Sequence, residues 1–80
     1  MKRILIIGAG AMGAAFSVPL IDNNQKVTIT EPYNLNLLKK INNKKKFHPA
    51  LKINLSKKLF IKKFNTELLN QKWDLIVIAV

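Results

Sequence analysis

Short apolar runs alternate with more polar stretches along this chain. Four runs are compact and rich in β-branched residues, as in buried parallel strands, at residues 4–7, 26–30, 59–64 and 75–80. The stretches between them predict helices at residues 11–23, 34–42 and 65–71, the second of which Asn34 caps. Residues 42–54 show neither pattern, so we expect an irregular segment there, with a turn at His48 and Pro49.

Three glycines follow the first strand in the stretch LIIGAGAMGAAF, residues 5–16. Their spacing is G-x-G-x-x-G, between a predicted strand and a predicted helix. In that setting Gly8 allows a tight turn, Gly10 lets backbone N–H groups approach a pyrophosphate, and Gly13 lets the helix pack closely on the strand. The phosphates would lie at the helix N-terminus, where unpaired N–H groups favour anions. The motif therefore predicts dinucleotide binding.

A secretory signal peptide is the alternative explanation of the same segment. A basic start at residues 1–3 precedes eighteen uncharged residues, 4–21, which reach the lower limit of a membrane span. The glycines and Pro19 interrupt this run, and no small-x-small cleavage site follows it. We therefore favour the strand, turn and helix, and we expect no membrane span. Pro19 should kink the helix or disturb its last turn, while Phe16, Leu20 and Ile21 face the sheet.

Strands that alternate with helices predict an α/β fold with a parallel sheet. Right-handed crossovers place the four strands in the order 3-2-1-4, the N-terminal four-strand portion of a doubly wound, Rossmann-type sheet. The last apolar run ends at Val80 with no fifth strand after it. We therefore expect residues 1–80 to be an incomplete N-terminal NAD-binding domain, truncated at its C-terminus and lacking a substrate domain.

An acidic residue follows the second strand, where the dinucleotide fingerprint requires one. Glu31 comes 23 residues after Gly8, at the carboxyl end of residues 26–30. An acidic side chain at this point accepts hydrogen bonds from the hydroxyls of the adenosine ribose. Its charge would also repel a 2′-phosphate. Glu31 therefore predicts NAD as the cofactor in preference to NADP.

Lysine dominates the charge of the chain. Fourteen Lys and Arg residues against four Asp and Glu residues give a net charge of +10, and ten of the lysines fall between residues 39 and 63. This excess suits a solvated surface and phosphate-bearing small ligands, and we expect no specific nucleic-acid partner. The chain has no cysteine, and His48 has no Cys, Asp or second His near it, so no metal site is predicted. The absence of cysteine fits a cytoplasmic protein.

The stretch MKRILIIGAGAMGAAFSVPLIDNNQKVTIT resembles the N-terminus of the NAD(P)-dependent glycerol-3-phosphate dehydrogenases, although ketopantoate reductases open with a similar G-A-G-A-M-G. The later stretches INNKKKFHPALKINLSKKLFIKKF and WDLIVIAV are also similar to segments of the dehydrogenase family. The resemblance covers essentially all of the chain, and the glycine motif is its sharpest part. It implies cofactor contacts by Gly8, Gly10 and Gly13, and by Ala11 and Met12 between the last two glycines.

The resemblance also implies an activity. The family transfers hydride between a nicotinamide and glycerol 3-phosphate or dihydroxyacetone phosphate, a phosphorylated triose, and so feeds phospholipid synthesis. Its catalytic lysine and phosphate-binding residues would lie beyond Val80, so we assign no catalytic residue and expect these 80 residues alone to be inactive. Two alternatives stay open: another Rossmann dehydrogenase, such as ketopantoate reductase, and a basic binding module without catalysis. The sequence does not indicate an oligomeric state.

Overall fold

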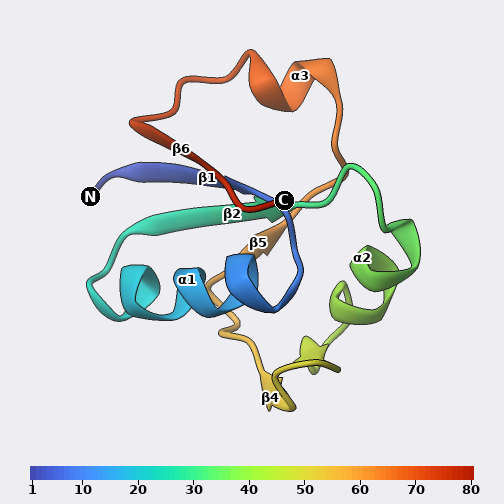
Figure 1. The fold of residues 1–80 in the computed structure, drawn as a ribbon. Coiled ribbons are helices and arrows are strands. Elements are labelled where there is room, and N and C mark those ends of the chain that lie inside the picture. Colours follow the sequence, from blue (N-terminus) through green and yellow to red (C-terminus); the bar gives the residue numbers. More distant parts are fainter.

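Four parallel strands form the central sheet of the computed structural model, which describes residues 1–80 (Figure 1). They are β1 (Arg3–Ile7), β2 (Lys26–Thr30), β5 (Phe60–Ile61) and β6 (Leu75–Ile78). Their order is β5-β2-β1-β6, which confirms the predicted order and the α/β, Rossmann-type arrangement. The first strand therefore lies inside the sheet, between β2 and β6.

Three helices connect these strands: α1 (Ala11–Asp22), α2 (Leu35–Ile41) and α3 (Thr66–Leu69). In Figure 1, α1 lies on one side of the sheet and α3 on the other. Asn34 and Asn65 cap α2 and α3, because their side-chain oxygens accept hydrogen bonds from Leu37 N at 3.0 Å and Leu68 N at 2.8 Å. Pro19 lies inside α1 without ending it, since the helix continues to Asp22. None of these helices has the length and apolar character needed to cross a membrane.

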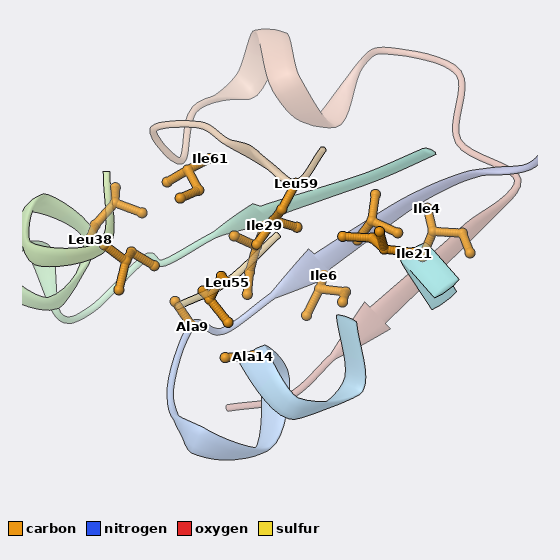
Figure 2. Packing of buried hydrophobic residues seen from close by; sticks show 12 residues of the cluster. Ile4, Ile6, Ala9, Ala14, Ile21, Ile29, Leu38, Leu55, Leu59 and Ile61 are labelled. Carbon is orange, nitrogen blue, oxygen red and sulfur yellow. The ribbon is translucent and has the colours of Figure 1, made fainter. Parts of the chain in front are cut away.

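The hydrophobic core lies between α1 and the sheet (Figure 2). Alternate residues of a strand point to the same face, so Ile4 and Ile6 of β1 are in register with Val27 and Ile29 of β2 and join them in one cluster. The other members come from the helices, from β5 and from the connecting loops: Ala9, Ala14, Ile21, Leu38, Ile41, Leu55, Leu59 and Ile61.

The buried face of α1 is formed mostly by small residues. Gly13, Ala14, Ser17 and Ile21 are its buried positions, and their spacing defines a single stripe along the helix. Ile21 faces the core as predicted, but the prediction for Phe16 is wrong, because its side chain is 48% exposed. Phe16 lies beside this stripe. The small residues of the stripe let the helix approach the sheet closely, so the larger Phe16 side chain stays at the surface.

The segment at residues 42–54 is more ordered than its sequence pattern predicts. Phe47–His48 (β3) and Ile53–Asn54 (β4) pair as an antiparallel hairpin. The ammonium of Lys46 holds this hairpin to the following loop, because Nζ donates to the carbonyl oxygens of Lys57 at 3.1 Å and Leu59 at 2.5 Å. Burial lowers the pKa of the Lys46 ammonium. This lysine is therefore structural, unlike the exposed lysines around it.

The third strand of the sheet is shorter than predicted. Only Phe60 and Ile61 form register pairs with β2, although the apolar pattern covers residues 59–64. Lys62 and Lys63 follow at once and are exposed, as suits an edge strand. The paired lysines therefore end the strand and leave it at one edge of the sheet.

Candidate functional site

The candidate site is the glycine turn, residues 8–10, which connects β1 to α1. It lies at the carboxyl edge of the sheet, between the ends of β2 and β6. Gly8 N donates to Thr30 O at 2.8 Å, and Ala79 N donates to Ile7 O at 2.8 Å. β2 and β6 lie on opposite sides of β1, so the strand order reverses direction at this point. α/β proteins bind their ligands at such a switch point.

Two of the three glycines are required by the backbone itself. Gly8 has a φ of +119°, a backbone angle that residues with a side chain rarely adopt. A Cβ there would also lie 2.7 Å from the Ala79 carbonyl carbon. A Cβ on Gly13 would lie 3.0 Å from the Gly8 carbonyl carbon and closer still to its oxygen. Gly13 therefore lets α1 begin directly against the turn, the role that its place in the motif predicts.

Gly10 differs from the other two because a side chain there would meet nothing in the protein. Its φ of −63° and ψ of −175° suit any residue, and a Cβ there would meet no atom within 4 Å. The dinucleotide motif has a glycine at this position so that a phosphate can approach the backbone closely. The fold itself does not require glycine here.

The first turn of α1 offers unpaired hydrogen-bond donors. The N–H groups of residues 10–13 donate to no other atom of the protein, and no side chain caps the helix. No acidic residue lies in this turn either, and Ala11 and Met12 are exposed. Unpaired N–H groups and the positive end of the helix dipole together favour an anion at this place.

The structure turns Glu31 toward the glycine turn. Its side chain is 6% exposed, and Oε1 accepts a hydrogen bond from Ala9 N at 2.8 Å. Oε2 accepts from Tyr33 N at 2.8 Å and Asn34 N at 3.0 Å. Burial by itself raises the pKa of the Glu31 carboxyl, but these three backbone hydrogen bonds outweigh it and hold the pKa below the ordinary value of 4.5. Glu31 is therefore an ionised, inward-facing carboxylate.

A second buried side chain contacts the same turn. His48, on β3, is fully buried, and its Nε2 lies 2.8 Å from Ala9 O. Its Nδ1 accepts a hydrogen bond from Leu51 N at 3.3 Å. Sequence reasoning missed this contact, since no motif marks a histidine 39 residues away from the turn that it reaches. In the sequence, His48 stands apart from other residues that could bind a metal ion, and this isolation was the only signal that it has a structural role.

A basic groove lies near the same edge of the sheet. Its volume is about 350 Å³, and its walls are formed by α2 and the residues after β5: Leu35, Leu38, Lys39, Asn42 and Lys63. Lys39 and Lys63 are exposed there. The chain holds no cluster of three or more His, Asp or Glu side chains that could bind a metal ion.

The structure therefore gathers the predicted residues around one place. Gly8, Gly10 and Gly13 form the turn and the start of α1, with Ala11 and Met12 in the exposed first helical turn. Glu31 borders the turn through its bond to Ala9 N. Contacts of these residues with a cofactor remain predictions.

Comparison with known proteins supports the same family. The chain is similar to an NADP(+)-dependent glycerol-3-phosphate dehydrogenase of Archaeoglobus fulgidus, with 46% identity over 55 residues. The match covers 66% of this chain and 16% of that protein, so the chain spans a small part of the relative's length. No family model matches the chain. The similarity to glycerol-3-phosphate dehydrogenases that the sequence indicated is confirmed over the matched segment.

Proposed function

We propose that residues 8–13 bind the pyrophosphate of a nicotinamide dinucleotide. The observation that carries this proposal is the group of unpaired N–H donors at residues 10–13, at a helix start where a side chain at Gly10 would meet open space. The donors suit phosphate oxygens, and a Cβ at Gly10 would occupy the space that the pyrophosphate needs. The residues present thus fit the group. When bound, the nicotinamide would supply or accept the hydride.

Glu31 has limited capacity for the adenosine ribose. A carboxylate offers about four lone-pair sites, and three backbone N–H groups occupy three of them. One site on Oε1 remains for a ribose hydroxyl. Because the negative charge is already balanced by three N–H dipoles, its repulsion of a 2′-phosphate is weaker than that of a free carboxylate.

The cofactor preference follows from this balance and from the basic groove. Lys39 and Lys63 place two positive charges near the carboxyl edge of β2 and β5, where the adenosine end of the cofactor would lie. The similar protein of Archaeoglobus fulgidus is named as NADP(+)-dependent. We therefore propose that NADPH binds at least as tightly as NADH, in place of the NAD preference that the charge of Glu31 alone predicts.

The activity of the whole enzyme is proposed from the similarity. We propose hydride transfer between the nicotinamide and glycerol 3-phosphate or dihydroxyacetone phosphate, a reaction that supplies phospholipid precursors. Such transfer needs a substrate held about 3–3.5 Å from the nicotinamide and an acid at its carbonyl. Because the match covers 16% of the relative, we place those residues outside these 80, and expect the chain alone to bind cofactor without turnover. A cytoplasmic location stays a prediction.

Titration of NADH and NADPH against the wild type and Gly10→Val tests the cofactor site, with calorimetry to measure affinity. The variant should lose binding because its side chain fills the space for the pyrophosphate, while its circular dichroism stays that of the wild type. Replacing Lys44 and Lys45, both exposed, with Gln gives a control that should leave NADH affinity nearly unchanged. Loss of NADH binding in that control but not in Gly10→Val would favour the basic binding module. Turnover assays on the full-length enzyme, with dihydroxyacetone phosphate and with ketopantoate as substrates, would distinguish the two dehydrogenase activities.

A further inference from the structure

Ala9 is held from two sides by buried side chains. Glu31 accepts a hydrogen bond from its N–H at 2.8 Å, and His48 Nε2 lies 2.8 Å from its carbonyl oxygen. Ala9 is itself fully buried between the first two glycines of the motif. Both polar groups of this one residue are therefore satisfied by side chains from distant parts of the chain.

The protonation of His48 follows from its two neighbours. Leu51 N is a donor and points at Nδ1, so Nδ1 must accept and carries no proton. The proton of the neutral ring then lies on Nε2, which donates it to Ala9 O. His48 is thus a directed hydrogen-bond donor to the glycine turn.

This bond fixes the direction of the next N–H group. The Ala9 carbonyl and the Gly10 N–H belong to one planar trans peptide unit, so they point in opposite directions. Because His48 draws the Ala9 oxygen inward, the Gly10 N–H points away from His48, and it has no partner in the protein. We infer that His48 is a positioning residue for dinucleotide binding, which aims the Gly10 N–H at the pyrophosphate; this inference rests on the proposed function.

The paired variants His48→Gln and His48→Asn separate this role from simple packing. The Gln amide nitrogen reaches the place of Nε2 and can donate to Ala9 O, whereas the Asn oxygen reaches only the place of Nδ1. His48→Asn should weaken NADPH binding about tenfold, the order expected for one lost buried hydrogen bond. His48→Gln should restore affinity to within about twofold.

Lys46→Met is the matched control on the same hairpin. It removes the bonds to the carbonyls of Lys57 and Leu59 and leaves the glycine turn untouched. The inference expects near wild-type NADPH affinity in this variant. If it weakens binding as much as His48→Asn, or if His48→Asn binds as well as the wild type, His48 only supports the hairpin and the inference is wrong. In both cases the wild type still binds, so the proposed function stands.

NMR of the wild type gives a second measurement that needs no variant to fold. The nitrogen shifts of the His48 ring should show the proton on Nε2, and the Gly10 amide should shift strongly when inorganic pyrophosphate or NADPH is added. A proton on Nδ1, or an unmoved Gly10 amide in saturated protein, would overturn the inference. Absence of any binding by the wild type would overturn the proposed function and the inference with it.

Discussion

The fold requires glycine at position 13 but not at position 10, and Gly13→Ala tests the structural requirement. In an ordinary helix, replacing Gly with Ala stabilises by up to about 1 kcal/mol. Here the added Cβ would lie 3.0 Å from the Gly8 carbonyl carbon, nearer still to its oxygen, and 3.4 Å from Ala79 Cβ. The carbonyl is backbone and cannot rotate away, since Gly8 N and Ala9 N are both hydrogen-bonded. The start of α1 must therefore move away from the turn.

The cost of that movement outweighs the gain in helix propensity. Overpacking that forces a backbone shift costs about 1–3 kcal/mol or more, and here the shift also loosens Ala14 and Ile21 from the core. We expect Gly13→Ala to lower the free energy of unfolding by about 1–2 kcal/mol after the propensity gain. A chain of this size has about 4–12 kcal/mol of stability in total, so the loss is easily measured.

Gly10→Ala is the matched control for this measurement. Its Cβ meets no atom within 4 Å and its φ of −63° is ordinary, so the free energy of unfolding should change by less than about 1 kcal/mol. Urea unfolding of the three proteins, followed by circular dichroism and by the fluorescence of Trp73, gives the comparison. If Gly13→Ala proves as stable as the wild type or more stable, α1 does not begin against the turn, and the assigned role of Gly13 is refuted.

Two further predictions concern charge at the site. Glu31→Gln should lower the free energy of unfolding by about 2–3 kcal/mol near neutral pH, because it weakens three hydrogen bonds to a buried carboxylate. Since the folded-state pKa of Glu31 is lowered, this advantage of the wild type is fully present above about pH 4.5 and is lost as pH falls through the folded pKa. A difference in urea stability that stayed constant into acid would contradict the prediction. Replacing Lys39 and Lys63 with Gln should weaken NADPH binding about five- to tenfold and NADH binding hardly at all. The same change at Lys57 and Lys58 should affect the binding of neither cofactor. An equal loss of affinity for both cofactors would show that the groove is not part of the site.

The sequence predicted the parts of the fold that depend on local pattern. The apolar runs at β1 and β2 mark the strands, and Asn34 caps α2 as its side chain predicts. The glycine spacing identified the turn because the requirement at Gly8 is a backbone angle, which only certain residues allow. Strand order followed from the handedness of the crossovers, which is a general property of parallel sheets.

What the sequence missed depends on contacts between distant residues. The hairpin around His48 carries no alternation of apolar and polar residues, and the structure shows it tied to the next loop by the ammonium of Lys46, one lysine among many. The inward turn of Glu31 was hidden for the same reason, since a carboxylate after β2 has the same sequence signal whether it meets a ribose or the backbone. Phe16 was misplaced because the small residues of α1, and not its large ones, set the buried face.

The proposed anion site is consequently a product of the folded chain and not of the motif alone. The glycines permit the turn, but Ala9 is fixed by Glu31 across 22 residues and by His48 across 39. The turn can therefore present its N–H groups in a defined direction only after β2 and the hairpin have packed against it. Groups oriented before the ligand arrives lose little entropy on binding, which is how a short, solvent-facing helix start gains affinity for a phosphate. In this proposal the buried carboxylate and imidazole hold the turn from behind, while the backbone N–H groups in front would contact the phosphate.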